Sequence, residues 1–293
     1  MIPILNIEQF DRVIHSNDVY SNELSDHLTK NKEIVHSAHR HDFFLCVFFT
    51  KGTGIHEIDF NNFDIQPGCV FFLKPGQTHL WRFDSDPEGF IFFHTRDFFE
   101  FGFSNAKLTQ FPFYYSDENP PNLQLKCDDF KSIKGLFKEI NDEYYKDAMY
   151  KEQKLSSLIN LIYIDLTRLY TSFESYRVIG STVYLSYLRK FEELIQKYYR
   201  KKKSVAFYAK ELNISSKHLN RITTNTIGKT PSEIINGRTI LEAKRLLVHS
   251  EDSLAEISDS LGYEDYAYFS KVFKMRTKTT PSNFRDNYKK QNP

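Results

Sequence analysis

Apolar residues in the last third of the chain recur at helical spacing on both sides of a short polar break. Tyr208 and Leu212 lie one helical turn apart before the break at 213–215, and Leu219 and Ile222 resume the same spacing after it. This pattern predicts a helix, a tight turn and a second helix, which together make a helix-turn-helix unit.

The same order of residue types returns 49 residues later, once a single inserted residue is allowed for. Ser253 followed by Glu256 has the spacing of a capping box, and Gly262 is suited to end the helix that begins there. Two copies of one helix-turn-helix unit, over 204–228 and 253–278, are therefore predicted.

One long helix is predicted between the two units, over about 230–248. Thr230 supplies an N-cap, Pro231 occupies the first helical position and Glu233 supplies the returning acid of a capping box. Ile234 begins an apolar stripe at helical spacing, which provides a face to bury. We expect this helix to hold the two units at a constant separation.

The duplicated unit resembles the DNA-binding domain of AraC-type transcription regulators. The resemblance is carried by A-K-E-L-N-I-S-S-K-H-L-N-R-I over 209–222, by G-K-T-P over 228–231 and by the block from 257 to 285. Ordinary helical hairpins can imitate one helix-turn-helix, but two copies with a proline-led segment after each are specific. The resemblance implies a sequence-specific, DNA-binding transcription regulator.

The second helix of each unit, about 216–226 and 265–276, is expected to lie in the major groove of double-stranded DNA. Leu219 and Ile222 must face inward in the first helix, as must Phe269 in the second, so helical geometry determines the outward positions. We expect DNA contacts from the outward residues Ser216, Lys217, Asn220, Arg221, Tyr266, Ala267, Ser270 and Lys271. The family resemblance implies base contacts for Lys217, Asn220, Arg221, Tyr266, Ala267 and Lys271.

For any one of these residues the alternative is a phosphate contact, which carries no sequence information. Tyr268 is compatible with the core or with a DNA contact, and we expect it in the core beside Val272 and Phe273. A non-specific architectural DNA binder remains an alternative for the whole protein.

A different pattern occupies about 34–93, where short apolar runs alternate with turn residues. The runs are 43–49, 55–60, 70–73 and 90–93, and they are separated by Gly52 and Gly54, Asn61-Asn62, Pro67-Gly68 and Pro75-Gly76. Short strands at such regular spacing predict an antiparallel barrel or jelly roll.

This segment resembles the cupin domain at the N-terminus of many AraC-type regulators. The resemblance is carried by the runs H-R-H at 39–41, G-T-G at 52–54, Q-P-G at 66–68 and P-G-Q-T-H at 75–79. In metal-binding cupins an H-x-H pair, a glutamate and a later histidine hold the ion. His39, His41 and His79 match these ligands, but Leu45 and Cys46 stand where the glutamate would fall.

Two hypotheses follow for this domain. A metal-dependent cupin enzyme would need about three or four firm ligands, whereas a regulator's cupin domain can bind an organic effector without any metal. We favour the second hypothesis and expect no cofactor, no metal and no catalysis. The expected binding residues are His39, His41, Lys51, His79 and Trp81, and a sugar or sugar-derived effector is one expected class. For Trp81 and Lys51, a core position and a solvated position respectively remain open.

Helical spacing also predicts amphipathic helices over 129–145 and 152–170. They resemble the family's dimer contact, and an intramolecular helical pair is the alternative for at least one of them. The segment 172–184 has no clear period and is expected to be a linker. The predicted fold is α+β in two domains. Residues 1–171 form a cupin-like domain for effector binding and dimerisation, and residues 185–293 form an all-α DNA-binding domain.

Charge separates the two parts of the chain. Residues 186–293 contain 21 Lys and Arg against 12 Asp and Glu, whereas residues 1–185 contain 18 against 26, so the net charges are +9 and −8. DNA would attract the basic part and repel the acidic part. The distribution agrees with a DNA-binding role for the C-terminal domain alone.

The remaining composition excludes several classes of protein. No apolar run approaches the ~20 residues that span a bilayer and no signal peptide is apparent, so a cytoplasmic protein is expected. Cys46, Cys69 and Cys127 lack metal-binding spacing and are expected as reduced core thiols. The expected partners are double-stranded DNA, a small effector, RNA polymerase and a second copy of the chain.

Overall fold

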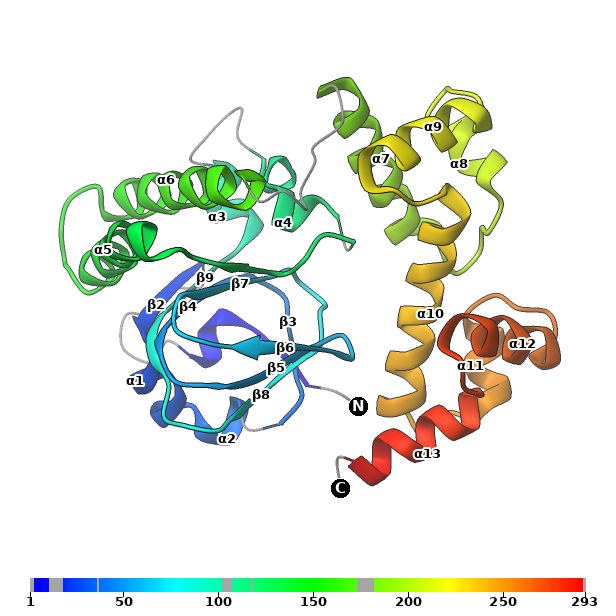
Figure 1. The fold of residues 1–293 in the computed structure, drawn as a ribbon, viewed down its shortest axis with the longest axis horizontal. Coiled ribbons are helices and arrows are strands. Elements are labelled where there is room, and N and C mark those ends of the chain that lie inside the picture. The colour runs from blue at the N-terminus through cyan, green and yellow to red at the C-terminus, as the bar shows by residue number, and fades with distance from the viewer. Residues whose placement is uncertain are drawn as a thin grey trace. The chain divides into compact units, whose positions relative to one another are not determined.

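The structure is a computed structural model that describes residues 3–10, 18–35, 37–101, 107–116, 118–172 and 182–291. The chain divides into two compact units, Ile2–Arg177 and Val178–Pro293. The first unit contains all the strands of the described residues and the second contains helices (Figure 1). Most of the predicted linker, 173–181, lies outside the described residues.

The first unit is built on a five-stranded antiparallel sheet. In spatial order its strands are β10 (Asn122–Gln124), β7 (Cys69–Leu73), β4 (Phe44–Lys51), β9 (Glu88–His94) and β2 (Val19–Glu23). The central strands β4, β7 and β9 are buried along most of their length because both faces of the sheet are covered. For this reason they read in the sequence as continuous apolar runs and not as alternating ones.

A second, three-stranded antiparallel sheet faces the first. Its order is β6 (Asn61–Ile65), β5 (Gly54–Ile58) and β8 (His79–Phe83). The ring of Phe71 on β7 lies 4.6 Å from that of His56 on β5, so side chains of both sheets meet in one aromatic core. A two-residue parallel pair, β1 (Ile4–Leu5) with β3 (Arg40–His41), lies beside them.

The predicted α+β class with an antiparallel N-terminal domain is confirmed, but the strand prediction was incomplete. β1, β2, β3, β6, β8 and β10 were not predicted as strands. Asn61 and Asn62, expected in a turn, begin β6; the turn is made by Asp59 and Phe60, whose φ angles are 47° and 68°. Cys127, expected in the core, is exposed at the first position of α5, whereas Cys46 and Cys69 are buried.

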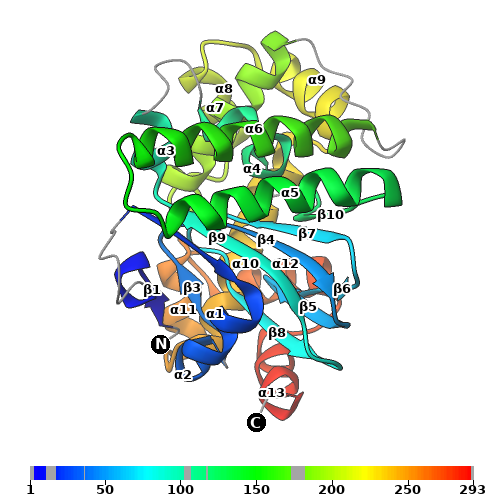
Figure 2. The same cartoon turned by 90° about the vertical axis from the view of Figure 1, so that its left-hand side faces the viewer.

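Two long helices cover the outer face of the five-stranded sheet (Figure 2). They are α5 (Cys127–Tyr144) and α6 (Lys151–Ser172), and the ring of Phe137 on α5 lies within 5.4 Å of those of Phe48 and Phe92 on the sheet. The shorter elements are η1 (Ile7–Gln9), α1 (Leu24–Lys30), α2 (Lys32–Val35), α3 (Arg96–Phe101), η2 (Leu108–Gln110) and α4 (Pro112–Tyr115).

The second unit is all-helical over its described residues. Its helices are α7 (Thr182–Tyr198), α8 (Val205–Glu211), α9 (Ser216–Ile227), α10 (Pro231–His249), α11 (Leu254–Ser260), α12 (Tyr266–Thr277) and α13 (Pro281–Gln291). The capping boxes predicted at Thr230 and Ser253 are both present, so the starts of α10 and α11 are determined locally. Among the described helices, none combines the length and the apolar composition that a bilayer span requires.

Candidate nucleic-acid interface and histidine cluster

Helix α9 presents the predicted outward face. The hydroxyl of Ser215 caps the helix by accepting a hydrogen bond from the backbone N–H of His218, 3.1 Å away. Leu219 and Ile222 are fully buried. The four predicted contact residues on this helix are all exposed: Ser216, Lys217, Asn220 and Arg221.

Arg221 is held by neighbours from two helices. One of its guanidinium nitrogens donates to Nδ1 of His218 at 2.8 Å, and the guanidinium carbon lies 6.0 Å from the ring centroid of Tyr184 on α7. His218 in turn packs edge-on against Tyr184 and Tyr187. Sequence reasoning did not assign a role to α7 in positioning this side chain, because 37 residues separate Tyr184 from Arg221.

Helix α12 shows the equivalent arrangement. The carboxylate of Asp265 accepts from the backbone N–H groups of Ala267 and Tyr268, which begins the helix. Phe269 and Phe273 are fully buried. Of the predicted contact residues on α12, Ala267 and Lys271 are exposed, and Tyr266 and Ser270 are half-buried.

The prediction that Tyr268 lies in the core was wrong, because its side chain is 60% exposed. Phe269 and Phe273, one turn apart, already fill the space under α12, and Tyr268 is rotated about 100° away from that face. It lies on the side of α12 that carries Lys271, three residues later. Tyr268 therefore joins the candidate DNA-contact residues.

A half-buried lysine, Lys203, connects three helices of the C-terminal unit. The ammonium of Lys203 donates to the carbonyl oxygen of Leu261 at 2.9 Å, to the hydroxyl of Thr239 at 3.3 Å and to the carbonyl oxygen of Tyr199. The pKa of Lys203 is lowered to about 8, mainly because the ammonium is partly removed from water and to a smaller extent because the positive charge of Arg200 is near. This single side chain thus joins the end of α7, the middle of α10 and the end of α11.

The carboxylate of Glu242 on α10 forms ion pairs with three arginines. Glu242 lies 3.0 Å from Arg200, 3.1 Å from Arg238 and 3.6 Å from Arg245. Burial by itself would raise the pKa of Glu242, but the arginines outweigh it and the pKa lies below its usual value. The cluster fixes α10 against the loop that follows α7.

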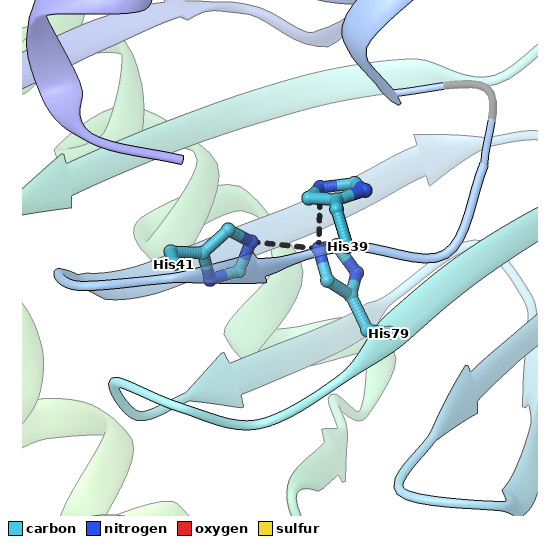
Figure 3. Close-up of side chains that lie close together, drawn as sticks. All are labelled: His39, His41 and His79. Carbon is cyan, nitrogen blue, oxygen red and sulfur yellow. Dashed lines mark hydrogen bonds between the residues drawn. The ribbon is translucent and has the colours of Figure 1, made fainter. Parts of the chain in front are cut away.

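The N-terminal unit contains a cluster of histidines on the inner side of its sheets. His41 on β3 places its Nε2 2.7 Å from Nε2 of His79 on β8, and Nε2 of His39 lies 3.0 Å from the same atom (Figure 3). The ligand atoms of these three side chains all lie within 4.8 Å of one another. The structure thus brings together the three histidines that the sequence selected.

A fourth histidine supports the cluster and was missed by sequence reasoning. Nε2 of His56 on β5 lies 2.9 Å from Nδ1 of His79, and both residues are buried. Strand alternation could have identified His56, because it faces Trp81, directly opposite on β8 and two residues from His79. Burial lowers the pKa of His39, His41, His56 and His79, which favours the neutral form of each imidazole.

The two other predicted binding residues are placed differently. Trp81 packs on the cluster, with its ring centroid 4.8 Å from that of His79. Lys51 is exposed at the end of β4 and forms an ion pair with Glu88 at 2.7 Å, and no described contact joins it to the histidines. Leu45 and Cys46 are buried in β4 and provide no carboxylate.

Two family models match the chain, one in each unit. Residues 29–103 match an AraC-like ligand-binding domain, and residues 208–287 match a helix-turn-helix domain. The first match includes the four clustered histidines, and the second includes both α9 and α12.

The chain is also similar to individual known proteins. The chain is 23% identical over 250 residues to the HTH-type transcriptional activator RhaS of Salmonella schwarzengrund (strain CVM19633), covering 84% of this chain and 86% of that protein. A crystal structure of ToxT from Vibrio cholerae is 15% identical, with a TM-score of 0.45 over 92% of this chain and 98% of that one. The C-terminal domain of the response regulator yesN from Fusobacterium nucleatum is 25% identical, with a TM-score of 0.31 over 32% of this chain and 93% of that one. With an AraC-like ligand-binding domain and a duplicated helix-turn-helix domain, the chain belongs to the AraC-type transcription regulators.

Proposed function

We propose that this regulator reads a specific sequence of double-stranded DNA through α9 and α12 and activates transcription there. The observation that carries the proposal is the pair of exposed helix faces, each on a helix-turn-helix unit, joined by α10 within a basic part of the chain. The two helices would lie in successive segments of the major groove, about 34 Å apart on one face of the duplex. The transcriptional activator RhaS, as a relative, supports activation over repression.

Direct base recognition is assigned to the exposed polar residues of the two helices. The guanidinium of Arg221 matches the acceptors of guanine, and the amide of Asn220 matches adenine. Lys217, Tyr266, Ala267 and Lys271 complete the proposed base contacts, and Ser216 and Ser270 would bond to phosphates. Because the outward residues of α9 and α12 differ, one chain would recognise an asymmetric site.

The N-terminal unit would bind a small effector and not transform it. The proposed site comprises His39, His41, His79 and Trp81; Lys51, which the sequence also suggested, would act at most at the rim. A sugar or sugar-derived compound is the class to test first. The resemblance to a family of regulators, and not of enzymes, supports this assignment.

Three further proposals complete the function. The chain would form a homodimer through its N-terminal unit, contact RNA polymerase at the promoter and act in the cytoplasm. The effector would change either the affinity for DNA or the contact with polymerase, and a coupling of about 1–3 kcal/mol is enough for control.

The central test is selection of binding sites from a pool of random duplexes by the full chain, at stated salt. The proposal expects one enriched, asymmetric sequence that binds at least about 1,000-fold more tightly than unrelated DNA. A flat selection, with equal affinity for all duplexes, would indicate an architectural binder and overturn the proposal. Effector binding can be followed in parallel through the fluorescence of Trp81, because the chain contains one tryptophan.

A further inference from the structure

We propose that His39, His41 and His79 bind one divalent first-row transition-metal ion, of the Zn²⁺ type, inside the N-terminal unit. The sequence favoured histidines around a metal-free pocket, since the expected glutamate is missing. The convergence of the three imidazoles supports a metal-binding site instead. This metal site goes beyond the proposed function, because neither DNA recognition nor effector binding requires a metal.

The three histidine side chains point towards one place. Figure 3 shows the imidazoles of His39 and His41, two residues apart on the segment that contains β3, pointing at the same nitrogen of His79 on β8. The two Nε2 to Nε2 distances are 2.7 and 3.0 Å. Imidazole nitrogens on one tetrahedral Zn²⁺ ion, with bonds of about 2.0–2.1 Å, lie about 3.3 Å apart. A movement of a few tenths of an ångström would therefore admit the ion.

Hydrogen bonds alone cannot satisfy the three Nε2 atoms that meet at His79. Nδ1 of His39 lies 2.8 Å from the carbonyl oxygen of Ser37, so it must donate, and its Nε2 is left with a lone pair. Nε2 of His79 carries either one proton or one lone pair, yet it faces two other ring nitrogens. One proton would have to be shared among three nitrogens, whereas a cation accepts a lone pair from each of them.

Neighbouring groups hold two of the proposed ligands through their second ring nitrogens. A metal-binding histidine usually donates its other N–H to a carbonyl or another acceptor, which fixes the ring. The carbonyl of Ser37 does this for His39, and Nε2 of His56 is placed to do it for His79 at 2.9 Å. The rings of His39 and His79 are thus oriented as ligands.

The donor set selects the kind of ion. All three ligands in the group are imidazoles, and no carboxylate or thiolate of the described residues belongs to it. Neutral imidazole suits Zn²⁺, Ni²⁺, Fe²⁺ or Cu²⁺, whereas Mg²⁺ and Ca²⁺ require oxygen ligands. Three ligands leave a position for water or for an oxygen of the effector, so metal and effector can share the site.

The test begins with the unmodified full chain, freed of metal by a chelator and then titrated with Co²⁺ and Zn²⁺. We expect one equivalent of Co²⁺ to give the strong visible absorption of a tetrahedral site, to quench Trp81 at the same stoichiometry and to be displaced by Zn²⁺. Absence of the absorption together with unchanged Trp81 fluorescence would overturn the proposal. This measurement requires no variant, so a folding defect cannot confuse it.

Variants then assign the ligands by equilibrium dialysis against Zn²⁺. His41→Ala should weaken binding by more than about 100-fold, and His56→Ala by about 10- to 100-fold, as expected for loss of a ligand and of a supporting residue. The matched control is His94→Ala, because His94 is equally buried in the same unit but is bonded to Tyr163 and Thr95. Equal Zn²⁺ binding by the His41 and His94 variants would refute the assignment.

The metal-binding test and the DNA-selection test can fail independently of each other. Metal binding is measured without DNA, and site selection is measured through α9 and α12. A chain that selects a DNA sequence but binds no Zn²⁺ would overturn only the metal proposal. A chain that binds Zn²⁺ but shows no DNA preference would overturn only the regulator proposal.

Discussion

Asn213 and Gly262 occupy the same position in the turns of the two helix-turn-helix units, and both have a left-handed backbone, with φ angles of 55° and 76°. Asparagine tolerates this conformation and glycine adopts it freely. The second turn is also crowded, because a Cβ atom on Gly262 would lie 1.9 Å from the carbonyl oxygen of Arg200. The same turn therefore tolerates a side chain in the first unit and excludes it in the second.

Gly262→Ala should destabilise the C-terminal unit strongly. Backbone strain and the clash with Arg200 together should cost about 3 kcal/mol or more. Gly228→Ala is the matched control, because Gly228 also has a left-handed backbone (φ 69°) but has open space around it; it should cost about 1 kcal/mol. Calorimetry of the full chain measures both, with Trp81 fluorescence reporting the N-terminal unit. Equal losses in the two variants would show that the turn can move away from Arg200.

Arg221→Ala should weaken binding to the selected DNA site by about 1–3 kcal/mol and relax its preference at one base pair. Arg221→Lys is the control, because it keeps the positive charge but loses the guanidinium that can form two parallel hydrogen bonds to a base. Both variants should lose the base preference, and the lysine variant should keep more affinity for unrelated DNA. Anisotropy titrations with the site and its single-base variants measure this. If Arg221→Ala weakens all sequences alike, Arg221 contacts phosphate and not a base.

Tyr268→Ala should reduce DNA affinity without unfolding the protein, since the side chain is 60% exposed. The neighbouring substitution Phe269→Ala should instead destabilise the fold, by about 3–5 kcal/mol, because Phe269 is fully buried. DNA titrations and thermal unfolding of both variants separate the two effects. A large loss of stability in Tyr268→Ala with normal DNA affinity would return Tyr268 to a structural role.

Glu242→Gln should destabilise the C-terminal unit by about 3 kcal/mol, because it leaves three arginines without their carboxylate. The pKa of Glu242 lies below its usual value in the folded chain, so the ionised group stabilises the fold above about pH 4.5 and this contribution is lost as the pH falls further. The difference in unfolding free energy between wild type and variant should therefore shrink below about pH 4.5.

Glu251→Gln, at an exposed position just after α10, is the control for Glu242 and should leave stability nearly unchanged. Urea unfolding at a series of pH values measures both variants. A difference between wild type and Glu242→Gln that stays constant down to pH 3 would mean that the carboxylate does not stabilise the arginine cluster.

The helical C-terminal unit followed from the sequence because its determinants are local. Thr230 and Ser253 cap helices through residues three positions away, and Gly228 ends α9 within one turn. Apolar spacing selected the buried faces of α9 and α12 for the same reason: neighbours on a helix are neighbours in the chain. The outward positions of both helices could thus be predicted from one turn of sequence at a time.

The tertiary structure decided the features that depend on distant partners. β2 and β10 are strands because β9 and β7 pair with them, and nothing in their own short sequences requires it. The exposure of Tyr268 depends on which rings fill the core beneath α12. The sequence by itself selected His39, His41 and His79 as chemistry-bearing residues, but their convergence on one point, with His56 behind them, arises only when β3, β5 and β8 meet across up to 40 residues of chain.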